Sequence, residues 1–265
     1  MRTVVVDACW RGEPGTGSPT AVVEGDLTDA ERARVPGDLG VSHAVFVDRT
    51  EPVVGLRFFT RAGELPACGH GTLAALAVLE AWDGRDEWRL RTAGREFLGG
   101  TTAEGPWFDA GLTRYRVPSV EDTAPVLAAL GVEPAGPVHA AGTARERLLV
   151  PVGPDRLGPL VPDFAALAAA CDAANLLGCF VYAPTGVRRF DARMFAPSIG
   201  VPEDAANANS TAALAGVLAA EGPVRVVVSM GESLGAPSRI RAEASPVETG
   251  ASVRLSGRVG PPRVR

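Results

Sequence analysis

A short run of reactive and small residues precedes an apolar stretch, because Cys68-Gly69-His70-Gly71-Thr72 leads directly into residues 73–82. Imidazoles transfer protons near neutral pH, and a helix N-terminus presents unpaired N–H groups that favour a carboxylate. Gly69 and Gly71 lack a Cβ, so a ligand can approach the backbone closely. The spacing predicts an anion-binding helix N-terminus that carries its own proton-transfer group, or else a plain turn capped by Thr72.

A second candidate N-terminus precedes the apolar residues 211–220. It reads Ala206-Asn207-Ala208-Asn209-Ser210 and follows Glu203 and Asp204. A carboxylate at this position can orient an imidazole, act as a base or simply be solvated. Two helix N-termini facing each other across a domain interface could hold both ends of a small anionic substrate.

The chain has three histidines, of which two are candidates for chemistry. His70 stands at the first helix N-terminus. His43 begins an alternating strand pattern and, taken alone, is an ordinary strand residue. His139 lies in a stretch without other reactive side chains, so we expect it to be structural or solvated.

Composition excludes several classes of protein. The 265 residues carry a net charge of −5, which argues against nucleic acid or an acidic membrane as a partner. No segment reaches the ~18 apolar residues of a membrane helix, and the N-terminus lacks the layout of a signal peptide. We therefore expect a cytoplasmic protein.

Missing residue types narrow the chemistry further. The chain contains no lysine, which excludes a Schiff base to an internal lysine and a Walker A loop. No GxGxxG follows a strand pattern, and the four cysteines lack zinc-type CxxC spacing. His43, His70 and Asp204 lack the helical spacing of a metal site. We expect no cofactor, no metal and no disulfide.

Apolar periodicity predicts many strands and few helices. Two predicted helices, at residues 73–82 and 211–220, are apolar on every side and should be buried. Three others, at 28–34, 120–131 and 163–175, are more polar. The predicted strands are residues 3–6, 43–48, 54–59, 87–92, 115–117, 148–152, 179–182, 191–195, 224–229, 238–242 and 252–255.

The two buried helices resemble an internal repeat. Residues 74–77 and 212–215 both read Ala-Ala-Leu-Ala, an offset of 212 − 74 = 138 that places Cys68 opposite Ala206, Gly71 opposite Asn209 and Thr72 opposite Ser210. A chance match of alanine-rich helices is the alternative. Duplication predicts an α+β fold with two pseudo-symmetric halves, residues 1–117 and 118–265. Each half is a mostly antiparallel sheet or barrel around a central helix, at 72–82 and 210–220, and the last strand can return to the first half.

Several motifs together resemble the PhzF-like isomerases of phenazine biosynthesis. The match covers nearly the whole chain in the same order. It comprises Asp7 with Gly17 to Val23, Val41 to Val47, Phe58-Phe59-Thr60 with Glu64 and Cys68 to Thr72, Arg193 to Pro197 with Gly200, Glu203 and Asp204, and Gly231 with Gly235 to Ser238.

This resemblance implies a diaminopimelate-epimerase-like fold and cofactor-independent proton transfer on a small carboxylate substrate. It also implies a cleft between the halves, usually in a homodimer. Family members use a glutamate, the "GH" histidine and the "ED" aspartate, which carry over as catalytic positions His43, His70 and Asp204. We expect substrate contacts from Ser18, Cys68, Gly69, Gly71, Thr72, Asn207, Asn209 and Ser210.

Two positions depart from the family pattern. His43 replaces the acid/base glutamate, and an imidazole can still transfer protons. Asn209 replaces a serine, and its amide can bind a carboxylate but cannot shuttle a proton. Both changes therefore indicate a substrate that differs from that of the family, while proton transfer remains the expected chemistry.

Three functions remain open. The leading interpretation is an isomerase that shifts a proton and a double bond on a small unsaturated amino or carboxylic acid, in specialised metabolism. An amino-acid racemase of the proline-racemase type would need two thiols, and only Cys68 lies at a helix N-terminus. A non-catalytic ligand-binding member of the fold is the third.

Overall fold

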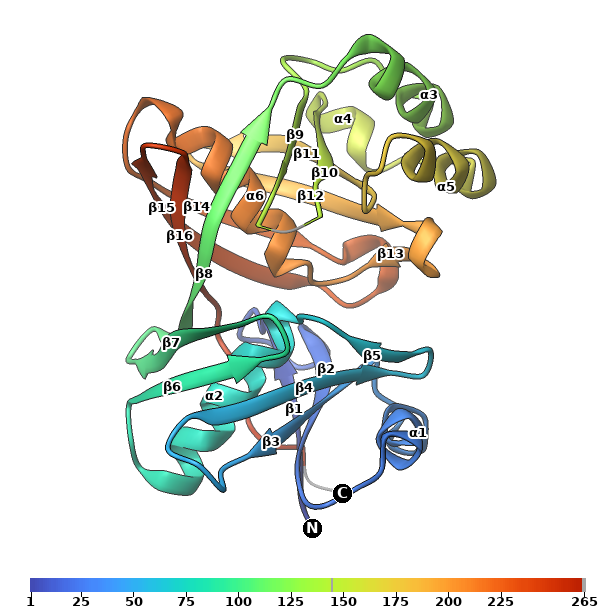
Figure 1. Cartoon of the computed structure of the whole chain (residues 1–265). Coiled ribbons are helices and arrows are strands. Elements are labelled where there is room, and N and C mark those ends of the chain that lie inside the picture. Colours follow the sequence, from blue (N-terminus) through green and yellow to red (C-terminus); the bar gives the residue numbers. More distant parts are fainter. Residues whose placement is uncertain (144, 264–265) are drawn as a thin grey trace. The chain divides into compact units, whose positions relative to one another are not determined.

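The computed structural model describes residues 1–143 and 145–263 and divides the chain into two compact units (Figure 1). The first unit contains Met1–Asp109, Ala236–Ile240 and the described residues from Leu255 onward; the second contains Ala110–Gly235 and Arg241–Arg254. The chain first passes from one unit to the other inside a strand, between Asp109 and Ala110, earlier than the boundary drawn after residue 117.

The first unit is a mostly antiparallel sheet with the order β1-β2-β3-β4-β6-β7-β8. Parallel pairs join β2 to β3 and β4 to β6, and β5 pairs with β4. Its elements are β1 (Arg2–Ala8), β2 (Ser18–Glu24), α1 (Asp29–Leu39), β3 (His43–Asp48), β4 (Val54–Thr60), β5 (Gly63–Leu65), α2 (Gly69–Asp83), β6 (Glu87–Thr92), β7 (Arg95–Thr102) and the first part of β8 (Gly105–Arg116).

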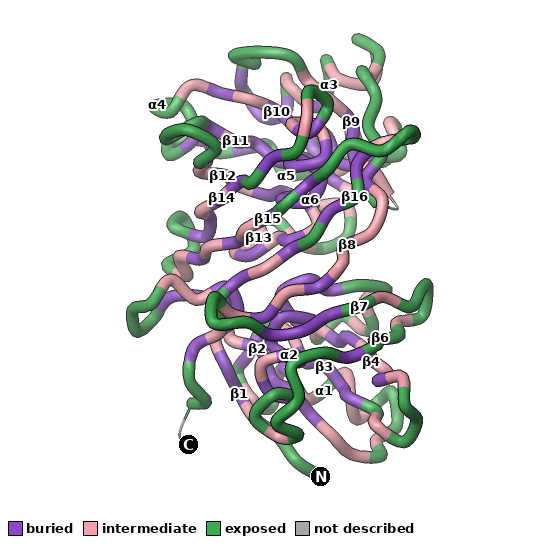
Figure 2. Tube along the Cα trace, turned by 90° about the vertical axis from the view of Figure 1, so that its left-hand side faces the viewer, coloured by how far each residue is buried: buried purple, intermediate pink, exposed green. Residues whose placement is uncertain are grey.

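Helix α2 is the buried centre of the first unit, as Figure 2 shows. Leu73, Leu76 and Leu79 are each 0% exposed. Burial of one leucine side chain stabilises the fold by about 1.5–3 kcal/mol, so an all-apolar helix is favourable only inside the sheet. The more polar α1 instead covers a separate cluster of apolar residues on β1, β2, β3 and β4.

The second unit closes into a ring of eight strands in the order β8-β16-β15-β14-β12-β11-β10-β9, with β9 pairing back to β8. Helix α6 packs inside against β9, β10 and β14. The elements are α3 (Val120–Leu130), β9 (His139–Gly142), β10 (Arg147–Pro151), α4 (Pro154–Leu157), α5 (Phe164–Ala173), β11 (Cys179–Gly186), β12 (Arg189–Ala196), β13 (Val201–Asp204), α6 (Ala208–Leu218), β14 (Val224–Met230), β15 (Ser238–Val247) and β16 (Gly250–Ser256), with 3₁₀ turns η1 (Pro197–Ile199), η2 (Ala219–Glu221) and η3 (Glu232–Leu234).

Helices α3 and α5 cover the other side of the β9–β12 strands. Val126 of α3 and Leu167 of α5 share one core cluster with Leu148, Val150 and Val181, all at most 1% exposed. Alternate residues of these strands therefore serve two cores, one around α6 and one beneath α3 and α5.

The predicted α+β fold with a central helix in each half is confirmed. Both helices begin earlier than expected, at Gly69 and Ala208, because glycine and small polar residues in a first turn carry no apolar periodicity. Strands β2, β5, β7, β9, β13 and most of β8 were absent from the prediction. None of the described helices is long and apolar enough to span a membrane.

Candidate functional site

Cys68 caps the N-terminus of α2. Its Sγ accepts a hydrogen bond from the N–H of Gly71 at 3.4 Å, while its carbonyl oxygen accepts from the backbone and hydroxyl of Thr72 at 3.0 and 2.9 Å. Thr72, the cap in the alternative interpretation of this run, is not the N-cap: its hydroxyl donates back to the Cys68 carbonyl from inside the first turn, and the residue is 3% exposed. The residue before Gly69 is the last with extended backbone, which is why the thiol rather than the hydroxyl reaches the free N–H groups.

His43 and His70 lie in direct contact. Their ring centroids are 4.3 Å apart with the planes at 85°, an edge-to-face arrangement. Strand β3 supplies His43 and the first turn of α2 supplies His70, which is 3% exposed. The sulfur of Cys68 faces the same ring of His70, 3.7 Å from Nδ1 and 3.5 Å from Nε2. Two imidazoles and a thiol thus form one cluster within the first unit.

A serine pair orients the ring of His43. Ser42 donates its hydroxyl to the carbonyl oxygen of Pro19 at 3.3 Å, and its oxygen lies 2.9 Å from Nδ1 of His43 and 3.3 Å from the hydroxyl of Ser18. When Ser42 directs its proton to Pro19, it accepts from Nδ1–H, and in that tautomer of His43 the lone pair lies on Nε2. Ser18 was expected at the site; Ser42, its link to His43, was not.

Gly71 is required by packing as well as by any ligand. A Cβ at this position would lie 3.0 Å from Cδ1 of Phe58 and 3.1 Å from Sγ of Cys68. The space beside Gly71, where we expected a ligand to approach the backbone, is therefore filled by the phenyl ring of Phe58 and the thiol of Cys68. Gly69, two residues earlier, is the first residue of α2 and is also buried.

Asn207 caps the N-terminus of α6 in the second unit. Its Oδ1 accepts from the N–H of Ser210 at 2.8 Å, and its Nδ2 donates to Oδ2 of Asp204 at 2.9 Å. The other carboxylate oxygen of Asp204 accepts from the N–H of Ala206 at 3.1 Å. Asp204 therefore fixes the cap residue, and its negative charge lies at the favourable end of the helix dipole.

The two caps correct the repeat alignment by one residue. Cys68 and Asn207 are both N-caps, and Thr72 and Thr211 both donate their hydroxyls to the cap carbonyl, an offset of 139 instead of 138. The Ala-Ala-Leu-Ala match misled the alignment because alanine-rich helix interiors fit in several registers. Cys68 therefore corresponds to Asn207, and not to Ala206.

Ser210 and Asn209 follow this cap. Ser210 is 0% exposed and donates its hydroxyl to Sδ of Met194 at 3.2 Å, away from solvent. The carbonyl oxygen of Asn209 accepts from Nη1 of Arg147 at 3.5 Å. Arg147 is 4% exposed, and its burial lowers the pKa of its guanidinium to about 10. Arg147 therefore places a buried positive charge beside the first turn of α6. Nothing in the sequence distinguishes it from a surface arginine, so it was not predicted.

Glu203 has a structural role. Its carboxylate forms two hydrogen bonds with the guanidinium of Arg193, at 2.9 and 2.8 Å, and accepts from the hydroxyl of Ser233 at 2.5 Å. Arg193 also donates to the carbonyl oxygens of Leu157 and Leu160. Breaking such a buried pair on one side is costly, so Glu203 holds β13 in place. It is neither a solvated acid nor a partner of Asp204.

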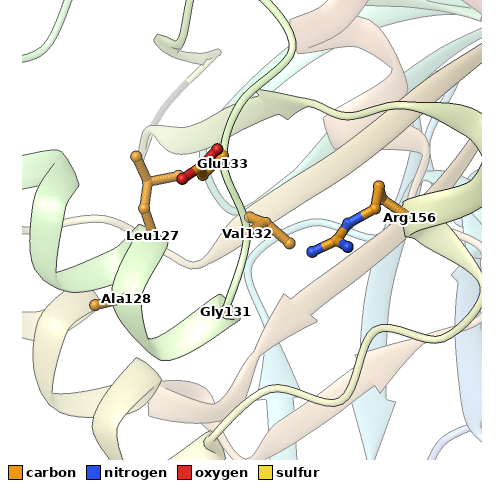
Figure 3. Close-up of a pocket in the computed structure, with 6 residues that line it drawn as sticks. All are labelled: Leu127, Ala128, Gly131, Val132, Glu133 and Arg156. Carbon is orange, nitrogen blue, oxygen red and sulfur yellow. The ribbon is translucent and has the colours of Figure 1, made fainter.

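Two cavities of the second unit are lined by residues other than the two N-caps, Asp204 and the histidines. One, of about 700 Å³, lies between the end of α3 and α4 and is lined by Leu127, Ala128, Gly131, Val132, Glu133 and Arg156 (Figure 3). The other, of about 460 Å³, is lined partly by Arg193, Glu232 and Ser233. Neither contains a histidine or a cysteine, so the candidate chemistry rests on the two helix N-termini.

One group of described side chains has the composition of a metal site. His43, Cys68 and His70 each offer a donor atom, and the three atoms lie within 4.8 Å of one another. This set differs from His43, His70 and Asp204, the combination whose sequence spacing does not support a metal site. The remaining histidine, His139, lies on β9 with its ring 6.3 Å from that of Tyr115.

Comparisons with known proteins agree with this architecture. The family model described as phenazine biosynthesis-like protein (PhzC-PhzF) matches residues 7–260. An uncharacterized isomerase of Deinococcus radiodurans is 33% identical over 89% of this chain and 84% of its own length. The trans-2,3-dihydro-3-hydroxyanthranilate isomerase of Pseudomonas aeruginosa is 30% identical over 96% of this chain and 93% of its own.

The fold agrees as well. The crystal structure of a phenazine biosynthesis protein of the PhzF family from Bacillus anthracis matches with a TM-score of 0.81, over 98% of this chain and 97% of that one, at 17% identity. The resemblance identified from the short motifs is therefore confirmed over nearly the whole chain. The chain belongs to the PhzC-PhzF family of phenazine biosynthesis-like proteins, a family of isomerases.

Proposed function

We propose that this protein is a cofactor-independent isomerase that moves a proton, and with it a double bond, on a small unsaturated amino or carboxylic acid. The observation that carries the proposal is the contact between His43 and His70 at the N-terminus of α2. One imidazole can remove a proton while its neighbour stabilises or transfers charge, and such general acid–base steps contribute about 10²–10⁴-fold each.

The reaction is balanced without an oxidant or a metal. Nε2 of His43 takes a proton from a carbon next to the double bond. The C–H electron pair forms the new double bond, and the original double bond accepts a proton at its far carbon from a protonated imidazole of the His43–His70 pair, whose N–H bond breaks. For His43 we assign the tautomer in which Nδ1–H donates to Ser42, which leaves Nε2 as the base.

The N-terminus of α2 supports binding of the substrate carboxylate. The N–H groups of Gly71 and Thr72 already donate to Cys68, whereas for the N–H of Gly69 no acceptor occurs among the described residues. The helix dipole favours an anion at this position. For Asp204 we propose a role in the same reaction, in which it sets the position of Asn207 and the charge at the N-terminus of α6.

A two-thiol racemase fits less well. Cys68 caps α2, but the corresponding residue of α6 is Asn207, an amide that cannot remove a proton from carbon. The other cysteines are buried in β11, α5 and the residue after β1. Racemisation through a pair of thiols therefore lacks its second group.

Deuterium incorporation followed by NMR tests the proposal. The panel contains trans-2,3-dihydro-3-hydroxyanthranilate, taken from the name of the Pseudomonas aeruginosa relative, cyclic unsaturated imino acids and proline. We expect deuterium at one carbon together with a migrated double bond. His43→Ala should abolish this, His43→Glu should restore part of it, and His139→Ala should leave it unchanged. Exchange at the α-carbon with inversion would instead indicate a racemase, and full activity of His43→Ala would remove His43 from the mechanism.

A further inference from the structure

The cluster of His43, Cys68 and His70 has the donor set of a zinc-type site. Zn²⁺ binds thiolate sulfur at about 2.3 Å and imidazole nitrogen at about 2.0–2.1 Å in tetrahedral geometry, which places a sulfur and a nitrogen donor about 3.5 Å apart. Sγ of Cys68 lies 3.5 Å from Nε2 and 3.7 Å from Nδ1 of His70, so the sulfur lies beside the ring and the imidazole must rotate to direct a lone pair at a shared metal. All three donor atoms lie within 4.8 Å of one another, so rotation of the side chains, without movement of the backbone elements, is what the site requires.

Neighbouring groups support these donors as they do in metal sites. A ligating histidine commonly donates its other N–H to an oxygen, and Nδ1 of His43 lies 2.9 Å from the hydroxyl oxygen of Ser42. A thiolate ligand is stabilised by a backbone donor, and the N–H of Gly71 lies 3.4 Å from Sγ of Cys68. The two groups that would support the ligands, Oγ of Ser42 and the N–H of Gly71, are thus already in place.

We propose that His43, Cys68 and His70 bind Zn²⁺ or a similar divalent cation as a three-ligand site with one open position, and that the bound metal blocks proton transfer. Zn²⁺ displaces the thiol proton of Cys68 to solvent and takes the lone pairs of the two imidazoles. Since a coordinated nitrogen cannot accept a proton, the metal is an inhibitor of the base assigned above. That blocking step rests on the proposed function; binding of the metal does not.

Other thiols of the chain do not offer a comparable site. Burial raises the pKa of Cys179 well above its usual range and that of Cys171 to about 11, so both remain protonated at neutral pH. Cys9 is 0% exposed. No group of metal-ligating side chains of this kind, other than that of His43, occurs among the described residues.

A Co²⁺ titration of the intact protein tests binding directly. We expect one Co²⁺ per chain and a near-ultraviolet thiolate-to-Co²⁺ charge-transfer band. Cys68→Ser should abolish the band while keeping a good N-cap for α2. Calorimetry with Zn²⁺ should show a loss of affinity of more than about 100-fold for His43→Gln, and of about 10-fold for Ser42→Ala, which removes only the outer hydrogen bond.

His139→Ala and Cys9→Ser are the matched controls and should bind as the wild type does. Absence of the band, or its persistence in Cys68→Ser, would overturn the site. If the wild type exchanges deuterium, one equivalent of Zn²⁺ should abolish exchange and a chelator should restore it. Undiminished exchange with Zn²⁺ bound would overturn the blocking role. A protein that binds Zn²⁺ through these residues but shows no exchange would refute the proposed function and leave the site established.

Discussion

Replacing Asn207 by alanine should loosen the central helix of the second unit. The substitution removes the cap acceptor for Ser210, worth about 1 kcal/mol, and the hydrogen bond to the carboxylate of Asp204, worth about 1.5 kcal/mol. Together these predict a loss of about 2.5 kcal/mol for Asn207→Ala, which corresponds to an equilibrium constant for opening of α6 that is about 70-fold larger. Asn207→Ser keeps a cap oxygen and should lose only the hydrogen bond to Asp204. The equilibrium constant for opening of α6 should then increase about tenfold.

Native-state hydrogen exchange measures this effect where it occurs. All four tryptophans, at 10, 82, 88 and 107, lie in the first unit, so fluorescence would not report on α6. Amides of α6 should lose more protection in Asn207→Ala than in Asn207→Ser, while the protection of amides of α2 should stay unchanged. Ser119→Ala, which removes the cap of α3, provides a matched control worth about 1 kcal/mol.

A double-mutant cycle with Asp204→Ala isolates the contact between the two side chains. We expect a coupling energy of about 1 kcal/mol or more, because each single variant already removes the shared hydrogen bond. Additive effects, or an Asn207→Ala cost no larger than that of Ser119→Ala, would refute the inference that Asp204 acts through the cap residue.

Three further outcomes follow from the packing and the charges. Gly216→Ala should destabilise the second unit by about 1–2 kcal/mol in thermal unfolding, because a Cβ would lie 2.5 Å from Cγ2 of Thr113 and overpacking outweighs the gain in helix propensity; a neutral result would contradict this. The hydrogen bonds from Arg57 lower the pKa of Glu64, so their stabilisation is present above the unfolded value of about 4.3 and is lost as pH falls through the folded value. Glu64→Gln should therefore be less stable than wild type in urea at pH 7, and the difference should shrink as pH falls below about 4.3. A gap that does not change with pH would argue otherwise. Cys171, with its pKa raised to about 11, should be about 0.1% thiolate at pH 8 and resist iodoacetamide in the native protein, as peptide mapping would show; labelling at the rate of a free thiol would exclude this burial.

The sequence predicted the architecture because its two central helices are unusual. An all-apolar helix must be buried, and two of them in similar surroundings indicate two similar halves. Strands such as β7 and β8 were missed because Gly99, Gly100 and Gly105 interrupt their alternation, and because polar residues on their exposed faces resemble loop composition. The first turns of α2 and α6 likewise contain small residues without apolar periodicity, so the predicted helices began too late.

The site was predictable in its residue types but not in its local contacts. The Cys68 to Thr72 run and the family pattern identified His70 and, by position, His43. That the two rings touch depends on the pairing of β3 with β2 and on the start of α2, which are tertiary features. Ser42 lies within the Val41 to Val47 motif, but its contact with the ring of His43 was not predicted. Whether a hydroxyl contacts a neighbouring ring depends on the rotamers of both side chains.

The most direct test of the central claim is deuterium incorporation by wild-type protein and His43→Ala in parallel, with metal removed by a chelator. The account predicts incorporation at one carbon, with a shifted double bond, in the wild type alone, and partial recovery in His43→Glu. Equal incorporation by wild type and His43→Ala would contradict the assignment of His43 as the base.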